Sequence, residues 1–134
     1  MVDAARAHAR RLCAACIALG HVGIVALGLT HRLAFGDPSG YRFLAVIGDN
    51  PTWILVHAAC AIVLMTSIAR DKGHVTALSF SSGWMGVWGF LTLLGGLTSP
   101  SPVSLAGPVL AIVLAATAYS GAMAWAVAPR RGGP

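Results

Sequence analysis

Residues 53–69, WILVHAACAIVLMTSIA, contain no charged side chain. At the rise of an α-helix, about 1.5 Å per residue, such a run approaches the roughly 20 residues that cross the hydrocarbon core of a bilayer. Three more runs of this kind occur, at residues 12–29, 75–97 and 108–128. Only 10% of the 134 residues are charged and 57% are hydrophobic, which is more apolar surface than a soluble domain of this size buries. The sequence therefore predicts a protein that crosses a membrane four times.

Helices are the expected form of these runs. Inside lipid the backbone must satisfy its own hydrogen bonds, and the runs lack the alternating pattern of a barrel strand. We predict an all-α protein, a single transmembrane domain (residues 1–134) folded as a four-helix bundle. Its longest connection is an outer loop at residues 30–52. Clusters of turn-forming residues in this loop leave room for a short interfacial helix at residues 41–47.

Basic residues are distributed unevenly between the two sides of the predicted bundle. Seven lie on one side, namely Arg6, Arg10, Arg11, Arg70, Lys72, Arg130 and Arg131, and only Arg32 and Arg42 lie on the other. Short loops rich in Lys and Arg stay in the cytoplasm. We therefore expect both termini inside and the protein in the cytoplasmic (inner) membrane. A cleavable signal peptide is the alternative for residues 12–29, but no small-x-small cleavage site follows them.

Small side chains recur at spacings of three and four within the predicted helices, which brings them onto common faces. In lipid, helices associate largely through close packing of such faces. We predict packing roles for Cys16, Gly20, Gly23, Gly83, Gly86, Ala115, Ala118 and Ala122, and the stripe of the third span also includes Ser79, Ser82 and Gly89. These faces can hold one chain together, and a face left over would drive homo-oligomerisation. The sequence leaves both uses open.

His21 and His57 are the only histidines inside the predicted spans. Counted at about 1.5 Å per residue from the cytoplasmic ends, they lie about 14 Å and about 18 Å into the membrane, close enough in depth to meet. Facing imidazoles can bind haem iron or relay protons. The simpler interpretation is that each neutral ring makes one interhelical hydrogen bond. We therefore predict no cofactor and keep a haem or quinone site at this pair as an alternative.

Patterns typical of catalysis, metal binding or nucleic-acid binding are absent from the sequence. Cys13 and Cys16 form a C-x-x-C pair, but the second pair that a zinc site needs is missing. No span contains paired carboxylates, and there is no Gly-rich phosphate loop, H-E-x-x-H or G-x-S-x-G motif. The basic stretches lie against the membrane, where they set topology and attract anionic lipid. We predict that the protein is not an enzyme, has no catalytic or metal-binding residues, and does not bind nucleic acid.

Three features carry a resemblance to known proteins: the segment GDNPTW at residues 48–53, the Ala-rich spans, and the use of eight Arg against one Lys. These features resemble the amino-acid usage of actinobacterial or actinobacteriophage proteins. The architecture is similar to that of small multi-span membrane proteins of phage lysis regions, including holins. The resemblance implies bundles that accumulate in the membrane, associate laterally and open a lesion that admits an endolysin. The expected partners are the lipid bilayer and further copies of the chain. The alternative from another class is an accessory or superinfection-exclusion protein that docks on another membrane protein.

Overall fold

The computed structural model describes residues 2–30, 43–100 and 105–127. These residues form α1 (Val2–Leu29), α2 (Leu44–Ile47), α3 (Asn50–Arg70), α4 (His74–Leu97) and α5 (Ala106–Val127). No strand occurs within the described ranges, so the predicted all-α class is confirmed for them. By length and composition, α1, α3, α4 and α5 are each able to cross a membrane. The four helices indicate a multi-pass membrane protein.

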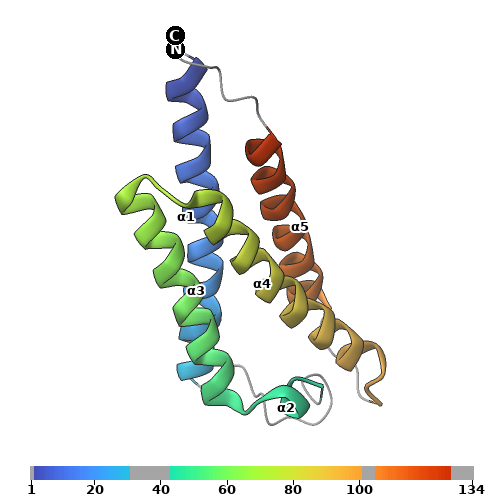
Figure 1. Ribbon diagram of the computed structural model, residues 1–134. Coiled ribbons are helices and arrows are strands. Elements are labelled where there is room, and N and C mark those ends of the chain that lie inside the picture. The colour runs from blue at the N-terminus through green and yellow to red at the C-terminus, as the bar shows by residue number, and fades with distance from the viewer. Residues whose placement is uncertain (1, 31–42, 101–104, 128–134) are drawn as a thin grey trace.

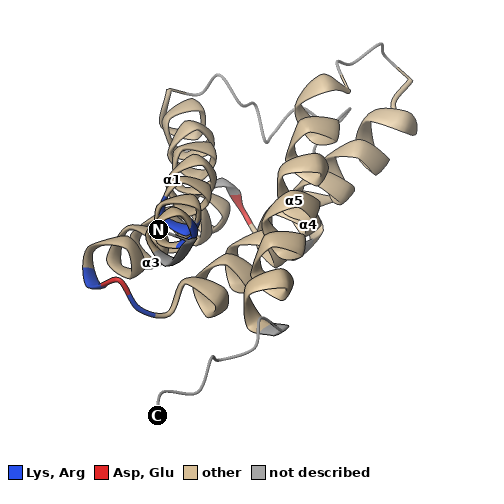
Figure 2. Ribbon diagram, turned by 90° about the horizontal axis from the view of Figure 1, so that it is seen from above, with Lys and Arg blue, Asp and Glu red and all other residues tan. Residues whose placement is uncertain are grey.

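The four long helices run alternately in opposite directions (Figure 1), so the beginning of α1 and the α3–α4 turn lie at one end of the molecule. We call this the turn end, and the opposite end, where α2 lies, the α2 end. Packing is most extensive between α4 and α5 and between α1 and α3, whereas α1 and α5 touch little. Figure 2 shows these two pairs side by side, seen from above. The bundle is therefore two closely packed pairs rather than four evenly packed helices.

The first helix begins at Val2, well before the predicted span at residue 12. The intervening segment AARAHARR is rich in strong helix formers, so it stays helical without needing lipid. In the outer loop, α2 occupies the second half of the interfacial helix predicted at residues 41–47. Residues 41 and 42 lie outside the described residues. The same holds for the end of the predicted fourth span, residue 128, and for Arg32, Arg42, Arg130 and Arg131.

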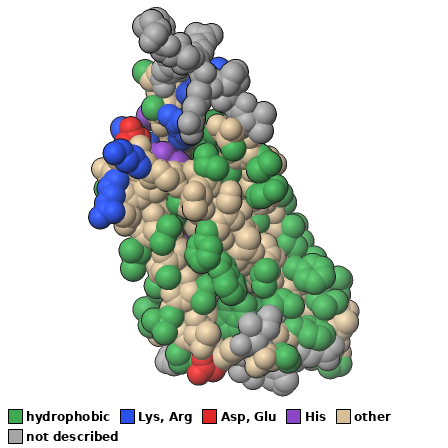
Figure 3. All heavy atoms as spheres, viewed as in Figure 1, with side chains coloured by type: hydrophobic (Ala, Val, Ile, Leu, Met, Phe, Trp, Pro, Cys, Tyr) green, Lys and Arg blue, Asp and Glu red, His purple; other side chains and the backbone are tan. Residues whose placement is uncertain are grey.

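All Lys and Arg residues in the described part of the chain lie at the turn end. They are Arg6, Arg10, Arg11, Arg70 and Lys72. Figure 3 shows them gathered there, while hydrophobic side chains cover much of the face toward the α2 end. This separation of a charged end from an apolar body is what a helix bundle in a bilayer requires.

An ion-pair cluster ties α1 to the α3–α4 turn. Arg11 contacts the Asp71 carboxylate at 3.1 Å, and His74 Nε2 lies 3.2 Å from the same carboxylate. The hydrogen bond that Arg11 donates, helped by the contact with His74, holds the pKa of Asp71 below its usual value. Asp71 and Gly73 both adopt the left-handed conformation (φ 49° and 74°), which makes the turn short.

The start of α3 is fixed by an N-cap. Asp49 accepts a hydrogen bond from the backbone N–H of Thr52 at 3.0 Å and another from its hydroxyl, and Pro51 occupies the first turn. The hydrogen bonds from Thr52 lower the pKa of the Asp49 carboxyl. Pro108 lies in the first turn of α5.

Candidate functional site

Two apolar clusters fill the interior, one toward each end. The turn-end cluster consists of Ala14, Ile17, Ala18, Leu64, Ala77, Leu78, Ala118 and Ala122. The α2-end cluster consists of Ile24, Leu44, Trp53, Met85, Trp88, Ala111 and Ala115. Between them along the helices lies a layer of polar side chains, which includes His21, His57, Cys60, Ser81 and Ser82 and is buried throughout. A buried polar layer inside a membrane bundle is costly, so it is the first candidate for a functional site.

His21 of α1 and His57 of α3 are in direct contact at the centre of this layer. Their Nδ1 atoms lie 2.7 Å apart, and both side chains are fully buried (0% exposed). The ring centroids are 5.0 Å apart, with the rings tilted by 43°. The sequence places these residues at similar depth, and the close packing of α1 on α3 brings them together.

The hydrogen bond between two Nδ1 atoms determines how the protons are arranged. In a neutral pair, one ring carries its proton on Nδ1 and donates, while the other accepts and carries its proton on Nε2. One Nε2 is therefore a free acceptor and the other a free donor. Among the described residues neither Nε2 has a hydrogen-bond partner, and the Nε1 of Trp88 has none either. These three buried atoms are therefore unused hydrogen-bonding capacity among the described residues.

Two indole rings flank His57. The Trp88 ring meets it at right angles, with centroids 5.9 Å apart, and the Trp53 ring lies 6.5 Å away. Trp53 is itself fixed, because its Nε1 donates to the carbonyl of Leu44 at 3.1 Å and so attaches α2 to α3. The imidazole pair thus lies against an aromatic wall on the side of the α2 end.

Neither a haem iron nor a bare metal ion fits between the two rings as they stand. A metal held by two imidazoles forms bonds of about 2 Å to each, so opposed nitrogens need a separation of about 4 Å rather than 2.7 Å. No group of three or more His, Cys, Asp or Glu able to hold a metal occurs among the described residues. Of the cysteines, Cys60 is buried in the polar layer, whereas Cys16 is exposed and Cys13 half-buried.

The predicted packing residues divide into two groups. Ala115, Ala118 and Ala122 are buried inside the bundle. An added Cβ at Gly86 would lie 3.6 Å from Ala115, and one at Gly20 would lie 3.4 Å from Met85. These five residues therefore serve contacts within the chain.

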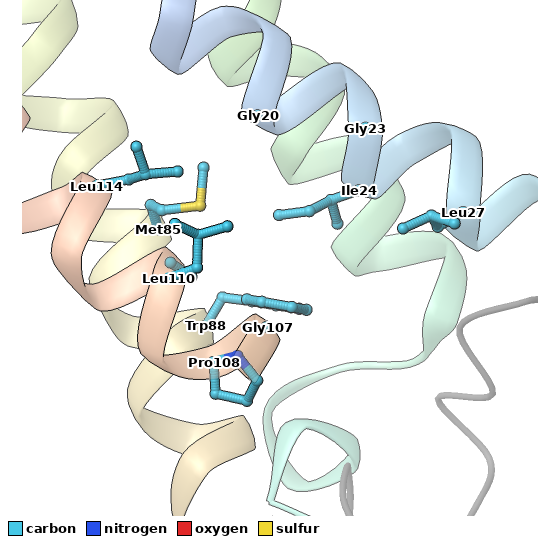
Figure 4. Close-up of a pocket in the computed structure, with 11 residues that line it drawn as sticks. Gly20, Gly23, Ile24, Leu27, Met85, Trp88, Gly107, Pro108, Leu110 and Leu114 are labelled. Atoms are coloured by element: carbon cyan, nitrogen blue, oxygen red, sulfur yellow. The ribbon is translucent and has the colours of Figure 1, made fainter. Parts of the chain in front are cut away.

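Three of the small residues face open space. A Cβ at Gly23, Gly83 or Gly107 would meet no atom of the described part of the chain within 4 Å. Cys16, which was predicted to pack as Gly23 and Gly83 were, is exposed. Gly23 and Gly107 line an apolar groove of about 420 Å³ between α1 and α5, with Trp88 beside them (Figure 4). Gly83 lines a second groove, of about 380 Å³, on the other side of the α4–α5 contact.

Two features of the site were not singled out from the sequence. The sequence gives no signal for Ser81, because serine is common in packed helices and its placement beside the histidines depends on the rotation of α4. The sequence also does not predict the position of Trp88, whose ring both lines the groove and contacts His57.

Comparisons of the chain with protein-family models, with curated proteins and with solved structures give no match. Function is therefore inferred from the geometry of the chain itself.

Proposed function

We propose that this chain is a holin-like protein of the cytoplasmic membrane, which associates laterally with further copies and permeabilises the membrane once enough have accumulated. The observation that supports this proposal is the set of open glycines. Gly23, Gly83 and Gly107 lie in apolar helices long enough to span a membrane, and an added Cβ there would meet no atom of the described residues within 4 Å.

Glycine at these three positions does not improve packing within the described bundle. A glycine within a helix is less favourable than alanine by about 1 kcal/mol, because it loses more backbone freedom on folding. At Gly86 and Gly89 this loss of stability is offset by close packing on α5. Gly23, Gly83 and Gly107 make no comparable contact with the described residues. In a bilayer, small residues at the surface allow the backbone of another helix to approach closely. A second copy of the chain is the partner that this proposal assigns to them.

The two grooves lie on opposite sides of the α4–α5 contact, since they use different faces of both helices. A subunit with two distinct association faces can bind one neighbour on each side. Such head-to-tail association extends beyond a dimer into rings or arrays. Growth of this kind is what a lesion large enough for an endolysin requires.

The orientation in this proposal has both termini in the cytoplasm. It is supported by the placement of every described Lys and Arg at the turn end, which agrees with the positive-inside bias. Alkaline-phosphatase fusions after Lys72 or Pro134 are expected to be inactive, and a fusion after Ser39 is expected to be active. Activity after Lys72 would reverse the orientation.

Inducible expression in bacteria tests the function. Membrane potential and entry of an impermeant dye would be followed after induction of wild type, Gly83→Leu and Ala59→Leu at matched membrane levels. We expect sudden depolarisation in wild type once a threshold is reached, and a marked delay in Gly83→Leu because leucine fills the groove. Ala59 is an exposed residue of α3 that lines neither groove, so Ala59→Leu should match wild type.

Sustained high expression of wild type without depolarisation or dye entry would refute the holin-like function. The grooves would then be assigned to a different membrane protein, as in the accessory or superinfection-exclusion alternative. Equal delay in Gly83→Leu and Ala59→Leu would show that the groove has no special part in association.

A further inference from the structure

We propose that His21 and His57 together form a proton-binding site inside the bundle, in which one added proton is shared by the two rings. This inference does not depend on the holin-like function. It rests on three observations: the 2.7 Å separation of the Nδ1 atoms, the complete burial of both rings, and the unused Nε2 atoms.

The neutral pair has one vacant position for a proton. The ring that donates from Nδ1 has a free lone pair on Nε2, and an incoming proton binds there. That ring becomes an imidazolium, and its Nδ1–H···Nδ1 bond to the other ring becomes charge-assisted. The Nδ1 proton can then cross the 2.7 Å contact, which moves the charge to the other ring without breaking the pair.

The pair can hold only one extra proton. After the first has bound, the only lone pair left on either ring is the one that accepts the Nδ1–H···Nδ1 hydrogen bond. A second proton would have to break that bond and would place two positive charges side by side on fully buried rings. The contact between α1 and α3 is therefore compatible with zero or one added proton but not with two.

The histidine pair is surrounded by aromatic rings rather than by acidic side chains in the described part of the chain. Trp88, with its centroid 5.9 Å from that of His57, is near enough for a cation–π interaction with an imidazolium. The backbone of Ser81 approaches His21 from α4. The buried thiol of Cys60 follows His57 by one turn on α3, and Ser81 and Ser82 of α4 are buried in the same layer. In the described parts of α4 and α5 there is no Asp, Glu, Lys or Arg.

The charged groups of the described chain lie at its two ends. Asp49 caps α3 at the α2 end. The cluster of Arg11, Asp71 and His74 lies at the turn end, where His74 also contacts the hydroxyl of Ser67. Between that cluster and the histidine pair lie the side chains of the turn-end cluster, including the fully buried Leu64 and Leu78. This apolar layer separates the histidine pair from the charged groups of the turn end.

The test uses the full chain with ¹⁵N-labelled histidine rings in lipid nanodiscs of phosphatidylethanolamine and phosphatidylglycerol, followed by NMR as the pH is lowered. We expect the His21 and His57 ring signals to change together at one midpoint, with uptake of one proton per pair. In His57→Gln the glutamine keeps a hydrogen bond to His21 but cannot share a proton, so the midpoint of His21 should move. His74→Gln, outside the layer, is the matched control and should leave the pair unchanged.

Three results would overturn the proposal. The first is separate midpoints that do not respond to substitution of the partner. The second is uptake of two protons with the contact intact, and the third is absence of any change in either ring across the whole pH range in which the bundle stays folded. If the glutamine variants do not fold, the number of protons bound by the wild-type pair still decides between one shared proton and two independent ones.

Discussion

Gly89→Leu is expected to separate α4 from α5 and to produce the largest loss of stability of any single substitution considered for this protein. A Cβ at Gly89 would lie 3.0 Å from Ile112, 3.1 Å from Ala111 and 3.1 Å from the carbonyl oxygen of Pro108. Two of these neighbours are atoms fixed to the α5 backbone, so they cannot rotate away. Even alanine should cost about 1–3 kcal/mol through overpacking, and leucine more.

Gly83→Leu on the same helix is the matched control, because a Cβ there would lie more than 4 Å from every atom of the described residues that surround it. Unfolding of both variants by SDS in mixed micelles, followed by circular dichroism, measures the difference. Gly83→Leu should unfold like wild type, and Gly89→Leu should already be destabilised at low SDS. Equal stability of the two variants would mean that α4 and α5 do not pack through Gly89.

Replacing one histidine of the pair is expected to lower the free energy of unfolding more than replacing both. In His57→Leu the Nδ1 of His21 loses its hydrogen bond to His57 and stays buried, at a cost of about 1–3 kcal/mol. The double variant His21→Leu/His57→Leu removes both polar rings and places apolar side chains between two apolar clusters. Its stability should therefore return close to that of wild type.

A double-mutant cycle in the same unfolding assay gives the coupling between the two residues directly. We expect a coupling of about 1 kcal/mol or more. His8→Leu serves as the control, since His8 is exposed near the start of α1 and should show no coupling to His57. Additive losses for His21 and His57 would show that the two rings do not contact each other in the membrane.

The positions of the spans could be read from the sequence because they depend on local properties. A run without charge, such as residues 53–69, is helical in lipid whichever neighbours it has, and Asp49 and Pro51 mark the start of α3 through bonds within one turn. The exception is α1, where hydropathy marks the apolar part from residue 12 but helix propensity extends the helix back to Val2.

Contacts between helices required the tertiary structure. Depth alone allowed His21 and His57 to meet, but contact also needs both helices to be rotated toward each other, and each residue turns the face of a helix by about 100°. That rotation is decided by the summed packing of every neighbouring face. The sequence has no local signal for it.

For the small residues too, the sequence predicts position along the helix but not the contacts made there. The sequence by itself determined that Gly83, Gly86 and Gly89 lie along one stripe of an apolar helix, because helical spacing is fixed. Only the tertiary structure decided that Gly89 packs closely on α5, whereas Gly83 lines the wall of an open groove. In lipid, no difference in polarity separates a buried small residue from an exposed one, so the pattern that reveals the core of a soluble helix is absent here. The side of each helix that packs is set by the shape of its neighbours, which exists only once the chain has folded.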